Sequence, residues 1–173
     1  MGMEEHMKKI LSILSVLLVA GILAGSLAFV PASSAMAQEN IDGALTKAYN
    51  FEQTWLSKQQ TAIDKATQAS AKVQELIDKA AASGLDVTAL QNALGSFDAS
   101  MSSVNAEHQS AASALSAHNG FDESGNVTDR QAARETVTTV RRALGNAHMT
   151  MTQATWALRD AVEAWKNANF PQG

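Results

Sequence analysis

A chain of 173 residues with a formal net charge of −4 has room for one domain and an appendage. Apolar residues make up 46% of it and aromatic residues only 5%, and so much alanine with few β-branched runs favours helices over a sheet. The lack of a basic excess argues against nucleic-acid binding, and the lack of cysteine excludes thiol catalysis and cysteine-ligated metals.

Residues 1–37 have the pattern of a signal peptide. Two lysines precede an apolar stretch over residues 10–30, and Ala35 and Ala37 then form an A-x-A site. We therefore expect cleavage before Gln38 and an extracytoplasmic location, secreted or periplasmic, in a bacterium.

Two features of this leader leave alternatives open. Residues 1–6 carry two glutamates, which a signal peptide disfavours, so they are interpreted as a start-site extension ahead of Met7. Residues 10–30 are also long enough, at about 1.5 Å per residue, to cross a bilayer. Cleavage is favoured, and an uncleaved membrane anchor over residues 10–30 is the alternative.

After the leader, apolar residues recur at spacings of three and four, which predicts helices over about 40–83, 86–118 and 128–169. Gly84 is the expected left-handed residue after the first helix, and Asn119-Gly120 ends the second. The expected first stripe is Leu45, Tyr49, Leu56, Ile63, Ala66, Val73, Ile77 and Ala80. The second is Val87, Leu90, Leu94, Phe97, Met101, Val104, His108, Ala111, Leu115 and His118.

The third predicted helix begins with Thr128-Asp-Arg-Gln131, a capping-box pattern in which Thr128 is the N-cap. Its stripe is Ala133, Val137, Val140, Leu144, Ala147, Met151, Ala154, Leu158, Ala161, Trp165 and Ala168. Short connections make consecutive helices antiparallel. The predicted fold of residues 38–173 is thus all-α, an elongated antiparallel up-down-up three-helix bundle with coiled-coil-like packing, preceded by a signal or anchor helix.

Four lysines, Lys58, Lys65, Lys72 and Lys79, recur every seven residues beside the first stripe. They could form a basic surface for an acidic partner or for lipid head groups. A flanking row of ion pairs and solvated side chains is the favoured interpretation, because acidic residues lie close to them in the sequence.

The loop HNGFDESGNVTDRQ shares part of the pattern of a calcium-binding EF-hand loop. With Gly125 at position six, Asp122 and Ser124 fall at ligand positions three and five, and Asn126 follows. Positions one and twelve are Gly120 and Gln131, which supply neither the first ligand nor the bidentate carboxylate. We expect a loop that turns the chain, with calcium at residues 120–131 as an alternative.

A copper or zinc site is the other metal alternative. His148 and Met151 share a helix face, but Met149 points elsewhere and Met151 belongs to the core stripe. Counting levels along an antiparallel bundle keeps the histidines apart, so hydrogen-bonded core histidines are favoured. No cofactor is expected.

The three tryptophans, Trp55, Trp156 and Trp165, are candidates for a role beyond packing. Trp165 is expected to project past the turn at Gly84. There, with Phe170, it would either cap the end of the bundle, which is favoured, or offer an apolar patch to a partner.

The stretches LQNALGSFDA, SAHNGFDESGNVTDRQAARETV and ALRDAVEAW resemble uncharacterised secreted alanine-rich helical-bundle proteins of bacteria. This resemblance implies an all-helical fold and export, and no activity or site residues. Phosphate loops and nucleophile elbows are absent from the sequence.

The expected function is that of an exported, non-enzymatic scaffold, adaptor or envelope-associated binding module whose partner is a protein or an envelope component. The alternatives are an extracytoplasmic metal-binding protein and a membrane-anchored stalk. Contact with a membrane is expected only through an uncleaved leader.

Overall fold

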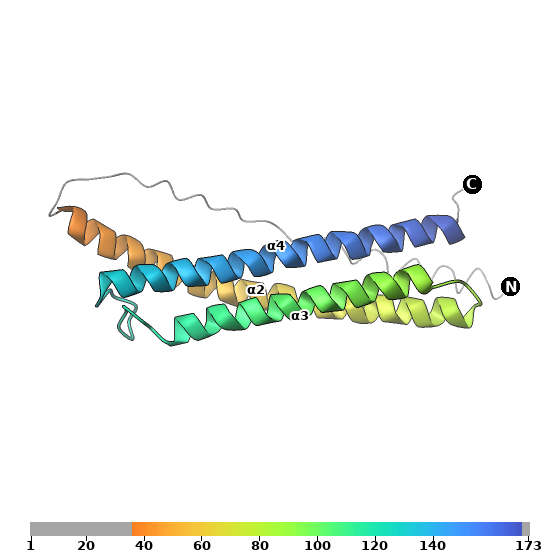
Figure 1. Cartoon of the computed structure of the whole chain (residues 1–173), viewed down its shortest axis with the longest axis horizontal. Helices are drawn as coiled ribbons and strands as arrows, with labels where there is room; N and C mark the ends of the chain where they lie inside the picture. Colours follow the sequence, from red (N-terminus) through yellow and green to blue (C-terminus); the bar gives the residue numbers. More distant parts are fainter. Residues whose placement is uncertain (1–35, 171–173) are drawn as a thin grey trace. The chain divides into compact units, whose positions relative to one another are not determined.

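The computed structural model describes residues 36–170, with side chains from Ile41 onward (Figure 1). Three helices, α2 (Met36–Ala82), α3 (Thr88–Ser116) and α4 (Arg130–Asn169), pack together, and there is no strand among these residues. This confirms the predicted all-α fold with three helices. The predicted leader lies outside the described residues except for its last two, which belong to α2.

The described chain divides into two compact units, and every helix contributes to both. The loop unit comprises residues 36–61 and 103–149 and contains the loop that joins α3 to α4. The turn unit comprises residues 62–102 and 150–170 and contains the turn that joins α2 to α3. None of the helices described between residues 36 and 170 combines the length and the apolarity needed to cross a membrane.

The turn between α2 and α3 follows from one glycine. Gly84 has φ 77°, a left-handed conformation that costs glycine little. Its N–H donates to the carbonyl of Ala81 (2.9 Å), and the N–H of Leu85 donates to the carbonyl of Ala80 (3.1 Å). This pair of hydrogen bonds is the Schellman motif, so the predicted role of Gly84 is confirmed.

The interior of the turn unit is apolar, and its members come from all three helices. The buried residues are Ile63, Val73, Leu76, Ile77, Ala80, Val87, Leu90, Leu94, Phe97, Met101, Met151, Ala154, Leu158, Val162 and Trp165. The predicted stripe was wrong near the end of α4, where Val162 is buried, Ala161 is half-buried and Ala168 is exposed. A helix with 3.6 residues per turn drifts from a strict seven-residue repeat, and the drift accumulates along α4.

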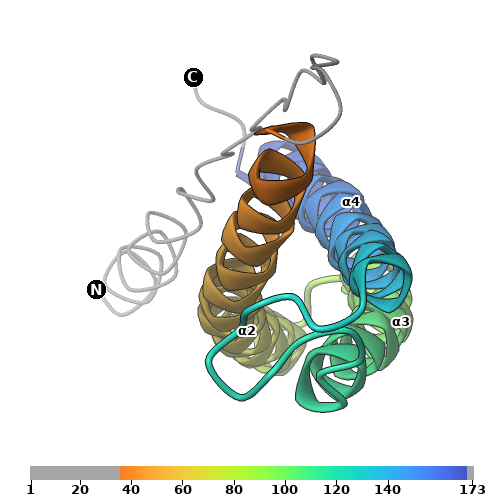
Figure 2. The same cartoon turned by 90° about the vertical axis from the view of Figure 1, so that its left-hand side faces the viewer.

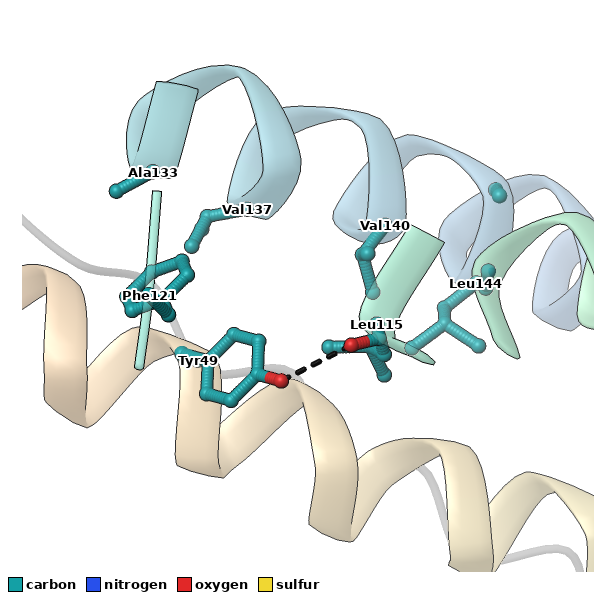
Figure 3. Close-up of a cluster of buried hydrophobic side chains, with 9 residues drawn as sticks. Tyr49, Leu115, Phe121, Ala133, Val137, Val140 and Leu144 are labelled. Atoms are coloured by element: carbon teal, nitrogen blue, oxygen red, sulfur yellow. Dashed lines mark hydrogen bonds between the residues drawn. The ribbon is translucent and has the colours of Figure 1, made fainter. Parts of the chain in front are cut away.

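The core of the loop unit lies where α2, α3, α4 and the loop between α3 and α4 meet (Figure 2). Its buried members are Tyr49, Ala111, Leu115, Phe121, Ala133, Val137, Val140, Ala143 and Leu144. In Figure 3, the rings of Tyr49 and Phe121 lie below the α4 side chains Val137 and Val140. The ring centroids of Tyr49 and Phe121 are 4.2 Å apart.

The start of α4 differs from the prediction. The N-cap is Asp129, whose Oδ1 accepts the N–H groups of Gln131 (2.9 Å) and Ala132 (3.0 Å). The Gln131 side chain donates forward to Glu135 rather than back to the cap, so the predicted capping box was wrong. The N–H of Thr128 donates to the carbonyl of Gly120 at 2.9 Å, which holds Thr128 in the loop.

Candidate functional site

Three polar side chains of α2 are buried in the loop unit. Tyr49, Glu52 and Gln59 are only 1%, 0% and 3% exposed, although α2 was predicted to bury an apolar stripe. They and the groups that they contact are called the polar seam here. Burying polar groups costs free energy unless each finds a partner, so the seam is the natural place to look for a function.

Glu52 is paired with Arg141 of α4. Its Oε1 accepts a hydrogen bond from Nε of Arg141 at 2.8 Å, and the arginine side chain remains 46% exposed. Oε2 of Glu52 is also buried and has no hydrogen-bond partner in the protein. Burial raises the pKa of Glu52, and the hydrogen bond and positive charge of Arg141 oppose that rise. Only one of the two carboxylate oxygens of Glu52 therefore has a hydrogen-bond partner in the protein.

Gln59 joins the three helices through one amide. Its Nε2 donates to the carbonyl of Leu144 in α4 at 2.9 Å. Its Oε1 must therefore be the acceptor for Nδ1 of His108 in α3, 3.0 Å away. This assignment gives His108 a proton on Nδ1.

Tyr49 makes the corresponding link at the end of α3. Its hydroxyl donates to the carbonyl of Leu115 at 3.0 Å (Figure 3), so its oxygen accepts from Nδ1 of His118 at 2.7 Å. His118 has φ 50°, a left-handed conformation uncommon for a residue with a side chain. The tyrosine thus holds the last turn of α3 and the residue that leaves it.

A shallow groove of about 240 Å³ lies beside this link. Its lining residues are Gln53, Leu56, Ala112, Leu115, Ser116 and His118. The seam itself connects α2 to α3 and α4 by hydrogen bonds and by one ion pair. What this arrangement does physically is to fix the register of the helices, because a one-turn slip would leave buried polar groups without partners.

The loop that was considered for calcium is closed by its own hydrogen bonds. Oδ1 of Asp122 accepts the N–H groups of Ser124 (2.9 Å) and Asn126 (2.8 Å), and Oδ2 accepts Nδ2 of Asn126 (3.1 Å). The Asn126 N–H and the other donors hold the pKa of Asp122 below its ordinary value. Both carboxylate oxygens are therefore engaged in turning the chain.

Glycine is required at one position of this loop. Gly120 has φ 84°, and a Cβ there would overlap the backbone of Asp129 and Ala133. The backbone can approach the start of α4 only because no side chain intervenes. Phe121 and Val127 form an isolated antiparallel bridge at the base of the same loop.

The residues considered for copper or zinc are separated by burial. Met151 is buried in the turn unit, His148 is half-buried and Met149 is 56% exposed. Over the part of the chain that the structure describes, no group of three or more histidine, aspartate or glutamate side chains is placed to hold a metal ion.

The candidate tryptophans differ in their surroundings. Trp165 is 6% exposed, its indole N–H donates to the carbonyl of Asp86 at 2.7 Å, and its ring meets Phe170 edge-on at 5.9 Å. The indole of Trp165 therefore lies against the turn between α2 and α3. Trp156 is 59% exposed on α4, and Phe51, which was not singled out from the sequence, is 53% exposed on α2.

The lysine row is on the surface of α2. Lys58, Lys65 and Lys79 are exposed and Lys72 is half-buried. Lys79 forms an ion pair with Glu75 at 3.7 Å, four residues earlier in the same helix. Such exposed pairs contribute little stability.

Sequence reasoning missed Glu52 and Gln59, although a signal was present. Both fall in the seven-residue row that contains Leu45, Ala66 and Val73 of the predicted stripe. Polar residues in an otherwise apolar heptad row indicate buried, paired groups. Of the residues at the predicted cleavage site, Ala35 lies outside the described residues, and Ala37 and Gln38 belong to the first turn of α2.

Comparison with protein-family models, with curated proteins and with solved structures found no match for this chain.

Proposed function

We propose that this protein is an exported, non-enzymatic three-helix module that acts through its outer surface as a scaffold, adaptor or envelope-associated binding protein. Export is supported by three features of the leader: Lys8 and Lys9, the apolar stretch over residues 10–30 and the A-x-A site at Ala35 and Ala37. Removal of the leader before Gln38 is part of the proposal, and a retained membrane anchor is its alternative.

The observation that carries the surface role is the way in which the interior is used. The Tyr49 hydroxyl, the Gln59 amide and the Thr136 hydroxyl are each bonded to the protein's own backbone or side chains. These groups are engaged in holding the helices together. A binding role is then left to side chains that the fold presents outward, such as Trp156 and Phe51.

We also propose the antiparallel up-down-up order with coiled-coil-like packing. In the loop unit, Tyr49 of α2 contacts Leu115 of α3, and Gln59, ten residues later in α2, contacts His108, seven residues earlier in α3. These contacts support an antiparallel arrangement of α2 and α3. Glu52 and Gln59 contact Arg141 and Leu144 of α4, so α2 and α4 ascend together. The heptad row through Glu52 and Gln59 agrees with this packing.

Export is tested by the mass of the chain recovered from the cell envelope or medium after expression of the full sequence. An N-terminus at Gln38 supports cleavage, and retention of residues 10–30 in the membrane fraction supports the stalk instead. A variant Ala37→Arg should block processing. Recovery of the unprocessed parent chain from the cytoplasm alone would contradict export in either form.

The surface role is tested by affinity capture from the envelope fraction with the parent chain and with Trp156→Ser. A partner that is retained by the parent and lost from the variant supports a binding module. Turnover of a small molecule by the purified chain, abolished by Glu52→Gln, would contradict the non-enzymatic proposal.

A further inference from the structure

The outer face of α2 in the loop unit combines aromatic and basic side chains. Lys47, Phe51 and Lys58 are exposed and are spaced by four and seven residues, which places them on one side of the helix. Trp55 lies beside them, with its ring centroid 6.4 Å from that of Phe51. These four residues are called the aromatic-lysine face.

The charged side chains of the aromatic-lysine face are the two lysines, Lys47 and Lys58. Between residues 41 and 61 the acidic residues are Asp42 and Glu52. Arg130 forms a bidentate ion pair with Asp42, in which Nε and Nη2 donate to the two carboxylate oxygens at 2.8 and 2.9 Å. Arg141 donates to the buried carboxylate of Glu52. Both carboxylates of this segment are therefore directed toward α4, and no acidic residue lies three or four positions from Lys47 or Lys58 in the sequence.

The aromatic members are held in place from within. Trp55 is half-buried and packs against the core of the loop unit, whereas Phe51 is 53% exposed. Phe51 is thus a large apolar side chain in water, supported on one side by a fixed ring. Its flanking lysines have long apolar stems and charged ends that can reach past it.

We infer that the aromatic-lysine face binds the surface of an anionic bilayer. The ammonium groups of Lys47 and Lys58 meet lipid phosphates, and Phe51 and Trp55 enter the interfacial layer between head groups and acyl chains. This inference deepens the proposed envelope-associated role and rests on it, because export is what brings the chain to such a surface.

Two features favour a bilayer over an acidic protein as the occupant. The face is one side of a single helix, and the groove of the loop unit lies elsewhere, between Leu56 and Leu115. A flat lipid surface fits a convex ridge that has an aromatic residue between two cations. The apolar stretch over residues 10–30 also precedes this face by fewer than twenty residues. In the alternative in which the leader is retained, it would hold the face near the membrane and raise its effective concentration.

The absence of cysteine from the chain allows a direct test. Thr54→Cys places one thiol at an exposed position beside Phe51, and Ser110→Cys places one on the exposed side of α3 as the matched control. Each is spin-labelled in the full chain, in whichever form, processed or not, the host yields. The label is then measured with vesicles of phosphatidylglycerol and phosphatidylcholine in equal parts, and with phosphatidylcholine alone.

The expected result is that the label at position 54 becomes accessible to oxygen and protected from a water-soluble relaxation agent with the anionic vesicles only. The label at position 110 should remain in water in both cases. Phe51→Ser should weaken vesicle binding by about tenfold, and Lys47→Glu with Lys58→Glu by about a hundredfold at low salt. Gln91→Ser, at an exposed position of α3 to which no role is assigned, should leave it unchanged.

An aqueous label at position 54 with both kinds of vesicle would overturn the inference. Binding to a soluble polyanion that is equally strong for the parent and for Phe51→Ser would also overturn it, in favour of an acidic polymer as partner. Thermal unfolding of each variant by circular dichroism excludes misfolding as the cause. The vesicle measurement uses purified protein, so its outcome is distinguishable from a failure of export.

Discussion

The loop unit and the turn unit are built from the same three helices but are held together differently. The interior of the turn unit is filled mainly by apolar side chains, whereas the buried residues that use polar side-chain groups to join helices, Tyr49, Glu52, Gln59 and Thr136, lie in the loop unit. Apart from the hydrogen bond of the Trp165 indole to the Asp86 carbonyl, the turn unit depends on side-chain volume and the period of its apolar residues. The loop unit also needs particular partners, and that requirement makes its register specific.

The largest expected difference concerns one glycine in each unit. Gly120→Ala should destabilise the fold by about 4 kcal/mol, because it adds both a clash with the backbone before α4 and a strained φ. Gly95→Ala, in α3 of the turn unit, has open space for its Cβ and should stabilise by about 0.5 kcal/mol. Urea unfolding monitored by circular dichroism measures the change in stability of both variants. Equal changes for Gly120→Ala and Gly95→Ala would contradict the expected difference between these two positions.

The buried ion pair should respond asymmetrically. Arg141→Ala should cost about 2 kcal/mol, because it leaves the Glu52 carboxylate buried without its cation. Glu52→Leu should be neutral or stabilise by about 1 kcal/mol, since the arginine it releases is partly solvated already.

The matched control for that pair is Lys79→Ala in the turn unit, which removes an exposed ion pair and should change stability by less than about 0.5 kcal/mol. Urea midpoints of the three variants test the asymmetry. A Glu52→Leu protein that is less stable than Arg141→Ala would show that the carboxylate is satisfied by a group other than the arginine.

Gln59→Leu should have a smaller effect. It removes the hydrogen bonds to His108 and to the Leu144 carbonyl, at a cost of about 1 kcal/mol, because the half-buried histidine can turn toward water. Gln91→Leu, at an exposed position of α3, should stay within about 0.5 kcal/mol of the parent. If both changes are equally mild, the amide is not part of what holds the loop unit together.

The smallest effects should appear in the pH dependence of stability, with opposite signs for two carboxylates. The hydrogen bond from Arg130 lowers the pKa of Asp42 below its ordinary 3.8, so its stabilising contribution is present above that pH and is lost as the pH falls through the folded value. Burial raises the pKa of Glu52 above its ordinary 4.5, so its destabilising contribution is present in full above the raised value, diminishes as the pH falls below that value and is gone below 4.5.

Urea midpoints at several pH values between 7 and 3, a range chosen to span both ordinary values, separate these contributions. The stability gap between the parent and Glu52→Leu should close at a higher pH than the gap between the parent and Asp42→Asn. Two gaps that do not change with pH would mean that neither carboxylate titrates differently in the folded and unfolded chain.

Local signals in the sequence were reliable where the partner is close in the chain. Gly84 was identified as a helix terminator because its φ depends only on the residues around it. The apolar stripe of α3 from Val87 to Leu115 is buried or half-buried in the structure, since a period of 3.5 residues places all of its members on one face.

Signals failed where two local choices were nearly equal or where a distant partner was needed. Thr128 and Asp129 are both good N-caps by residue type, and in the fold Asp129 is the one that accepts the N–H groups of Gln131 and Ala132. For the candidate site, Tyr49 was assigned to the core, but Glu52 was left out because a carboxylate is rarely buried unless it is paired. The aromatic-lysine face was missed as well, since the exposure of Phe51 depends on packing.

Helix formation, the position of the sharp turn and the helical class of the fold therefore follow from the amino-acid order, because helical hydrogen bonds and apolar periodicity act over a few residues. The polar seam does not follow from it. Gln59 meets His108 at a separation of 49 residues, and Glu52 meets Arg141 at a separation of 89. Whether a polar side chain can be buried depends on the group that packing brings against it, and that group is chosen by the assembled fold.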